Sequence, residues 1–247
     1  MAKKFNNTRC IYCLKHFEIL TSDHVFPKGW YPDTTPQNLE KWQVPACEEC
    51  NTKYSKIEGE LLQKIGMCVA PDQLAALGIA NKALRSLNPK HARNPIDRRC
   101  REKNRDKMVR SMIPAVRSPL ESIVPGFGFY PGVDPFEQYA IPVSKNSLDL
   151  FGEKLIRCFT YKIHTRFIEA DHKVSVWIAH EEHAKPLIET LRQYGAEYHQ
   201  GPGIKIRAAY TPEDPISGAF EIIILGKLHL YGMILPVTDP SESKEVR

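Results

Sequence analysis

The sequence predicts an α+β protein in three successive parts, and three observations lead to this prediction. Two Cys-x-x-Cys pairs fall within residues 1–70, which indicates a small domain stabilised by a metal ion. Residues 71–146 are first strongly basic and then rich in proline and glycine, as is typical of a partly helical, partly irregular connector. Residues 147–240 show helical and then strand-like apolar spacing, which predicts a C-terminal α+β domain with a small, mainly antiparallel sheet.

The composition is that of an ordinary globular protein. Of the 247 residues, 42% are hydrophobic and 26% are charged, and the net charge is +5. No stretch approaches the about 18 consecutive apolar residues of a membrane span, and the first residues show no signal-peptide pattern. We therefore expect a cytoplasmic protein with no membrane contact. In a reducing compartment its seven cysteines are not expected to form structural disulfides.

Four of the cysteines have the spacing of a structural zinc site. They form two matched pairs: Cys10, Cys13, Cys47 and Cys50. Four thiolates complete a tetrahedral shell and leave no position for a catalytic water molecule. The alternative, four unrelated buried thiols, does not explain why they occur as two pairs. The other three cysteines stand alone and are expected to be free thiols: Cys68, Cys100 and Cys158.

Four polar residues lie between or just after the cysteine pairs, where a zinc-binding fold does not need them: Asp23, His24, Asn38 and Asn51. Each also has an ordinary explanation. An Asp-His pair is common in solvated loops, Asn38 follows a proline in a turn-like stretch, and Asn51 is placed to cap a helix. Their order along the chain is more specific than any one of them.

This region resembles the four-cysteine, zinc-containing branch of the HNH, or ββα-metal, endonuclease family. The family pattern is Cys-x-x-Cys, Asp/Glu-His-x-x-Pro, Asn-Leu and Cys-x-x-Cys-Asn/His. The chain matches it with Cys10-Ile11-Tyr12-Cys13, Asp23-His24-Val25-Phe26-Pro27, Asn38-Leu39 and Cys47-Glu48-Glu49-Cys50-Asn51. The resemblance covers about a quarter of the chain. After Asn51 many relatives have a Lys-Gly pair, whereas this chain reads Lys53-Tyr54.

The resemblance implies an enzyme that hydrolyses phosphodiester bonds of DNA with a divalent metal ion. His24 would be the general base, because a neutral imidazole accepts a proton near neutral pH. Asp23 and Asn51 would bind the catalytic Mg²⁺ or Mn²⁺ through oxygen atoms. Asn38 would tie the intervening loop to the backbone and so aim the His24 ring. Glu58 and Glu60 lie farther along the helix expected after Asn51. Either could reach this metal, but we favour a solvated helix face for both.

Residues 82–117 are strongly basic, and their net charge exceeds that of the whole chain. They contain twelve Lys and Arg residues against three acidic ones, a local charge of +9. Cationic side chains bind phosphates by releasing counterions, which predicts contact with nucleic acid, double-stranded DNA in particular. The alternative is a solvated helix or a disordered linker, because runs of charged residues often form one or the other. The sequence carries no information on the oligomeric state.

The C-terminal part has a regular apolar pattern but no motif with recognisable chemistry. We expect a helix over 148–167 with Ser147 or Asn146 as its cap, and a second helix over 184–194 that ends at Gly195. Four strands are expected, over 174–178, 204–210, 220–225 and 228–235. The role of this part stays open.

Two other functions compete with the nuclease. The first is a zinc module that binds nucleic acid or protein without catalysis. The second is a redox protein that uses its Cys-x-x-Cys pairs, which is disfavoured because no thioredoxin-like βαβ pattern surrounds them.

Overall fold

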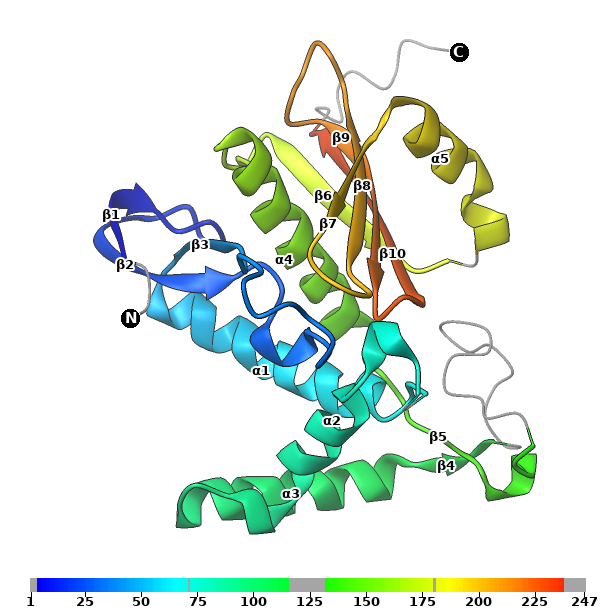
Figure 1. Ribbon diagram of the computed structural model, residues 1–247. Helices are drawn as coiled ribbons and strands as arrows, with labels where there is room; N and C mark the ends of the chain where they lie inside the picture. Colours follow the sequence, from blue (N-terminus) through cyan, green and yellow to red (C-terminus); the bar gives the residue numbers. More distant parts are fainter. Residues whose placement is uncertain (1–3, 71, 116–131, 180, 238–247) are drawn as a thin grey trace.

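The structure, a computed structural model, describes residues 4–70, 72–115, 132–179 and 181–237. Within these residues the fold is mixed α+β with antiparallel sheets, as the sequence predicts (Figure 1). A three-stranded sheet and a long helix form the N-terminal part. A five-stranded sheet between two helices forms the C-terminal part. Most of the Pro/Gly-rich stretch, residues 116–131, lies outside the described residues, as does the C-terminal end of the chain after residue 237.

The N-terminal sheet has its strands in chain order, and both pairs are antiparallel. The strands are β1 (Phe5–Arg9), β2 (His16–His24) and β3 (Gln43–Ala46). Helix α1 (Glu48–Gly66) begins directly after β3, with Cys47 as its N-cap residue. Two glutamates occupy its first turn, where the positive end of the helix dipole favours negative charge. Because β3 pairs with the end of β2, the first turn of α1 is brought next to the last residues of β2.

The basic run folds into two helices on the far side of α1. Helix α2 (Ile79–Leu87) packs against α1, and α3 (Pro95–Ser111) follows it. The Asn94 side chain caps α3 by accepting a hydrogen bond from the Asp97 backbone N–H at 2.8 Å. Met108 is the one buried residue of α3. This helix therefore extends away from the rest of the molecule and presents nearly all of its surface to solvent (Figure 1).

Short elements lead the chain around these helices. Two strands of two residues pair with each other, β4 (Ile113–Pro114) and β5 (Tyr139–Ala140). Four 3₁₀ helices lie among the described residues: η1 (Lys28–Trp30), η2 (Leu74–Ala76), η3 (Pro89–His91) and η5 (Pro135–Glu137). Of these, η1 follows directly after the candidate site on β2.

The C-terminal sheet is antiparallel throughout, in the order β6-β10-β9-β8-β7. Its strands are β6 (His172–Trp177), β7 (Ala196–His199), β8 (Lys205–Tyr210), β9 (Gly218–Ile224) and β10 (Leu228–Pro236). Helix α4 (Lys145–His164) covers one face and α5 (Glu181–Tyr194) covers part of the other (Figure 1). No helix in the described part of the chain is long and apolar enough to cross a membrane.

The expected C-terminal helices and strands are confirmed, with two corrections. Helix α4 begins three residues early, and its cap is Ser144, whose hydroxyl accepts a hydrogen bond from the Ser147 backbone N–H. The predicted caps, Ser147 and Asn146, therefore lie inside the first turn. Strand β7 was not expected, because it is an edge strand with three of its four residues titratable and little apolar alternation.

One hydrophobic core runs through both parts of the molecule. The ring of Trp30 stacks on Phe151 of α4 with centroids 5.0 Å apart, and Trp42 lies 6.1 Å from Phe159 of the same helix. Helix α4 therefore packs against the C-terminal sheet on one side and against the N-terminal part on the other. The domain boundaries at residues 70 and 146 stay a prediction, but α4 clearly links the two parts.

Candidate functional site

Four cysteine sulfur atoms gather in the N-terminal part: those of Cys10, Cys13, Cys47 and Cys50. All lie within 4.8 Å of one another, and the Sγ atoms of Cys13 and Cys47 are 3.9 Å apart. A tetrahedral ion with Zn–S bonds of about 2.3 Å separates its sulfur ligands by about 3.8 Å. The cluster can therefore hold a metal ion such as zinc, as the spacing of the two pairs predicts.

Each cysteine pair lies on a tight turn. The first turn closes where the backbone N–H of Leu14 donates to the Cys10 carbonyl at 2.9 Å, with Leu14 in the left-handed region. The second pair lies at the start of α1, and the Cys47 backbone N–H donates to the Cys10 sulfur at 3.4 Å. Burial raises the pKa of Cys10, but backbone N–H groups outweigh it and hold that pKa below its usual value. At Cys10 this favours the thiolate, the form that binds metals, whereas burial raises the pKa of Cys13 and Cys50.

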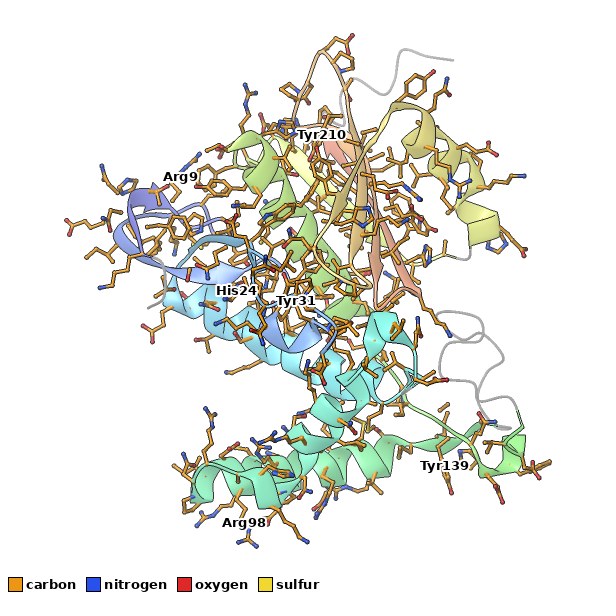
Figure 2. All side chains as sticks on the ribbon, in the orientation of Figure 1. Arg9, His24, Tyr31, Arg98, Tyr139 and Tyr210 are labelled. Atoms are coloured by element: carbon orange, nitrogen blue, oxygen red, sulfur yellow. The ribbon has the colours of Figure 1, made fainter. Side chains whose placement is uncertain are left out.

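A cavity of about 580 Å³ lies between the end of β2, the start of β3 and the first three turns of α1. Three of the four polar residues predicted from the sequence line it: Asp23, His24 and Asn51. Figure 2 labels His24 near the junction of the N-terminal sheet with α1 and α4. The cavity is also lined by Lys28, Gln43, Ser55 and Glu58. Strand β2 and helix α1 thus bring distant parts of the sequence to one cavity.

His24 is the last residue of β2 and is half-buried. Its Nε2 lies 3.4 Å from the side-chain amide nitrogen of Gln43, its partner across the sheet. Its Nδ1 is buried without a hydrogen-bond partner among the described residues. Burial lowers the pKa of His24, and the nearby cations, Lys28 foremost, lower it further. The ring is therefore neutral at cellular pH, and its unpaired nitrogen is the kind of exception to hydrogen-bond satisfaction that functional sites show.

Asp23 points to the other side of β2 and is buried, with 6% of its surface exposed. Its Oδ2 accepts a hydrogen bond from the Tyr12 hydroxyl at 2.5 Å and lies 3.0 Å from Lys154 Nζ. Its Oδ1 has no partner among the described residues, although the side chain lines the cavity. One oxygen is thus held by the protein, and the other stays available.

Asn51 lies in the first turn of α1, directly after the second cysteine pair. Its Nδ2 donates to the Ser22 carbonyl on β2, and its Oδ1 accepts from Ser55, both at 3.4 Å. Asn51 and Asp23 together offer an amide and a carboxylate oxygen on one cavity, the donor type that Mg²⁺ and Mn²⁺ prefer.

Asn38 is not brought to this cavity. It is exposed, in the loop between η1 and β3, and its side chain makes no hydrogen bond to any described residue. The turn is closed by the backbone alone, where the Leu39 N–H donates to the Pro36 carbonyl at 3.1 Å. The expected tie between this side chain and the loop is therefore absent from the described residues. Gln43 contacts the His24 ring instead.

Glu58 is a correction to the sequence analysis, which favoured a solvated helix face. It lies two turns after Asn51 on α1, is only 7% exposed, and pairs with Lys154. Burial raises the pKa of Glu58 to about 7, although the ammonium of Lys154 acts to lower it. The Lys154 side chain is fully buried. Burial acts to lower its pKa, but the two carboxylates outweigh this effect and hold the pKa above its usual value.

The basic helix α3 lies apart from this cavity. Among its 17 residues, seven are basic and three are acidic. Several of these charges pair within the helix, as Arg101 does with Asp97 at 3.1 Å. Arg98 pairs with Glu102 at 3.2 Å, although its side chain is 68% exposed and points into solvent (Figure 2). Arg99 and Lys103 are exposed and have no ion-pair partner among the described residues.

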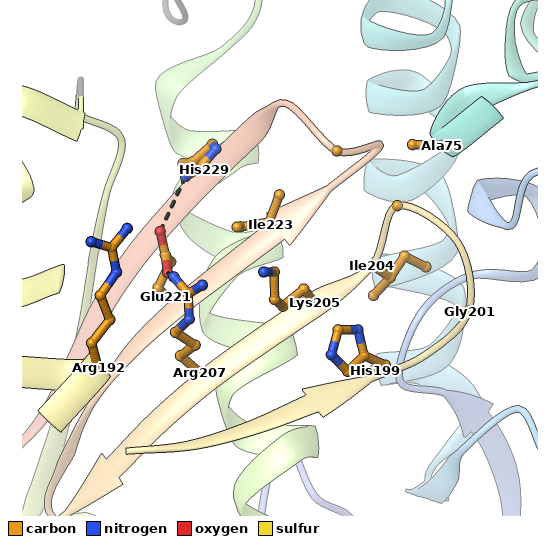
Figure 3. Close-up of a pocket in the computed structure, with 12 residues that line it drawn as sticks. Ala75, Arg192, His199, Gly201, Ile204, Lys205, Arg207, Glu221, Ile223 and His229 are labelled. Carbon is orange, nitrogen blue, oxygen red and sulfur yellow. Dashed lines mark hydrogen bonds and ion pairs between the residues drawn. The ribbon is translucent and has the colours of Figure 1, made fainter. Parts of the chain in front are cut away.

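A second cavity, of about 470 Å³, lies on the face of the C-terminal sheet that α5 leaves open (Figure 3). The buried Glu221 on its floor pairs with Arg207 at 2.5 Å and with His229 at 3.2 Å. Arg207 also binds Glu197 at 2.8 Å. These are cross-strand contacts between neighbouring strands, in which opposite charges satisfy one another. They account for the buried charge without a ligand.

Comparisons of the chain with models of protein families, with curated proteins and with solved structures found no match. The assignment of a function therefore rests on the site itself.

The sequence analysis did not predict the contribution of Lys154, which reaches the site from α4. A signal was present, because Lys154 stands among the apolar positions of its helix, three residues after Phe151 and next to Leu155.

Proposed function

We propose that this chain is a metal-dependent endonuclease of the HNH (ββα-metal) type, in its four-cysteine branch. One observation carries the proposal: Asp23, His24 and Asn51 line a single cavity next to the four-cysteine cluster. The sequence resemblance implies three elements: a strand that ends in Asp-His, a neighbouring strand, and a helix with Asn in its first turn. The reaction would be hydrolysis of phosphodiester bonds in DNA.

In this proposal His24 is the general base. Its neutral ring accepts a proton from the attacking water, a role that contributes about 10²–10⁴-fold to a rate. The lowered pKa of the ring and its place on the cavity wall support this assignment. Gln43 contacts the opposite ring nitrogen and limits rotation of the imidazole.

Asp23 and Asn51 would hold the catalytic Mg²⁺ or Mn²⁺, with the carboxylate Oδ1 and the amide oxygen as ligands. When bound, such an ion neutralises charge on the scissile phosphate and on the leaving oxygen. The four cysteines would hold a structural Zn²⁺ with no open position. That zinc fixes the start of α1 and hence the position of Asn51.

The partner would be double-stranded DNA, bound through the basic segment 82–117, of which residues 82–115 are described. The exposed arginines and lysines of α3 support this part of the proposal. Nonspecific contacts to phosphates need only such charges on an accessible helix. We also propose a cytoplasmic location, where reduced cysteines stay available for zinc.

The test is cleavage of supercoiled plasmid DNA by the purified chain with Mg²⁺ or Mn²⁺. We expect nicked and linear products, which EDTA stops while elemental analysis still finds about one zinc per chain, because four thiolates hold zinc tightly. If the plasmid stays intact with every divalent ion while zinc is present, the chain is instead a non-catalytic zinc module. Zinc content near zero would remove the structural basis of both.

A further inference from the structure

A fully buried charge in the candidate site comes from the other half of the chain. The Lys154 side chain on α4 is 0% exposed. Its Nζ lies 3.0 Å from Oδ2 of Asp23, donates to the His24 carbonyl at 2.9 Å and contacts Glu58. The ammonium thus donates hydrogen bonds to the His24 carbonyl and to Glu58, and it forms an ion pair with Asp23.

Burying these three ionic side chains together costs folding free energy. Removing an ammonium and two carboxylates from water carries a desolvation penalty that their mutual attraction often only offsets. Apolar side chains of similar size at all three positions, 23, 58 and 154, would fill the same space without that penalty. Packing alone therefore does not account for a lysine here.

A second contact from the same helix reaches the same carboxylate. Cys158, one turn after Lys154, lies 3.3 Å from the Tyr12 hydroxyl, and that hydroxyl donates to Oδ2 of Asp23 at 2.5 Å. Tyr12 lies between the two cysteines of the first pair. Helix α4 thus holds Asp23 both directly and through the first cysteine turn. Both contacts use Oδ2, and no described residue binds Oδ1 of this cavity-lining side chain.

We propose that Lys154 is a positioning residue of the nuclease site. Its ammonium fixes Asp23 through Oδ2 and fixes the end of β2 through the His24 carbonyl, so the C-terminal half completes the site. Lys154 acts through these two residues and does not touch the substrate. This inference rests on the proposed function, but one of its consequences can be measured without DNA. Because the ammonium lies next to Asp23, it also weakens the binding of a divalent cation there.

The experiment compares two variants of the full chain. Glu58→Gln is the reference, since it keeps the pair between Lys154 and Asp23. The double variant Glu58→Gln/Lys154→Met removes the ammonium without leaving two carboxylates unpaired, which protects the fold. Lys145→Met, at an exposed position of the same helix, is the matched control. Thermal unfolding and zinc content verify the fold of each variant.

We expect kcat of the double variant to fall about 10²-fold below that of Glu58→Gln, because the loss of an orienting contact at a metal ligand typically costs 10–100-fold. The plasmid KM should change less than about threefold, since no DNA contact is lost. Binding of Mn²⁺, followed by electron paramagnetic resonance without DNA, should become about tenfold tighter or more, because a positive charge is removed. A lysine that only supports the fold would lower kcat and weaken Mn²⁺ binding together.

The inference is overturned if the double variant matches Glu58→Gln in kcat, or if its Mn²⁺ affinity is equal or weaker. A wild-type chain that does not cleave DNA defeats the proposed function separately. The Mn²⁺ titration decides the inference in that case as well. Tighter binding in the double variant supports the control of Asp23 by Lys154, and unchanged binding contradicts it.

Discussion

Two buried ionic networks in this molecule have opposite charge patterns. In the N-terminal cavity a single cation, Lys154, lies between two carboxylates. On the open face of the C-terminal sheet a single carboxylate, Glu221, lies between Arg207 and His229 (Figure 3). The central side chain is almost completely buried in both, at 0% and 1% exposure. Burial alone therefore does not distinguish the two sites.

The networks differ in how the fold produces them. The partners of Glu221 lie 8 and 14 residues away, on the neighbouring strands, so sheet register alone places them. Two of the Lys154 contacts span 96 and 130 residues, to α1 and β2, and form only when both halves are folded together. The long-range network also lies next to a histidine nitrogen without a partner. The Glu221 contacts connect neighbouring strands of one sheet, whereas the Lys154 contacts connect both halves of the chain at the candidate site.

The largest expected effect is on stability, and it tests whether the two networks differ in energy. Lys154→Met leaves two buried carboxylates without their cation, which should lower the free energy of unfolding by about 3–5 kcal/mol. Arg207→Met should cost about 1–2 kcal/mol, because Glu221 keeps His229 and the site is open to water. Urea unfolding at a common m-value measures both. Equal losses in the free energy of unfolding would mean that the two networks contribute equally to stability.

A smaller effect concerns DNA binding, where the basic helix α3 is compared with the sheet cavity. Replacing Arg99 and Lys103 by Gln should reduce the slope of log Kobs against log salt by about 2, since each lost phosphate contact contributes about 0.9. The matched variant replaces Arg192 and Lys205 of the sheet cavity by Gln and should leave the slope unchanged. Fluorescence anisotropy with a labelled duplex between low and moderate salt gives both slopes. If only the sheet-cavity variant reduces the slope, the DNA contact lies on the C-terminal sheet and not on α3.

Much of the fold follows from local sequence patterns. The spacing of Cys10, Cys13, Cys47 and Cys50 predicted a cluster because two tight turns can close on one ion. The C-terminal helices and strands followed from apolar spacing, which is set by burial on one face. The short edge strand β7 did not, because an exposed edge needs no apolar alternation. Likewise the cap of α4 depended on a choice among neighbouring polar residues, which spacing alone does not make.

The candidate site was predicted where it depends on the N-terminal strand and helix. Asp23, His24 and Asn51 are brought to one cavity, whereas Asn38 is exposed in its loop. The contribution of Lys154 was not predicted, since it requires α4 to pack against a part of the chain about 100 residues earlier. Helical spacing places a residue on a face, but it does not say which distant element that face meets.

The central claim is that the His24 imidazole is the general base of a phosphodiesterase site. Its most direct test is the rate of plasmid cleavage by His24→Ala, at saturating Mg²⁺ or Mn²⁺, next to His16→Ala, which alters an exposed histidine of the same strand. We predict a loss of about 10²–10⁴-fold for His24→Ala and a wild-type rate for His16→Ala, with zinc content the same in both. Equal cleavage by His24→Ala and the wild-type chain would contradict the account.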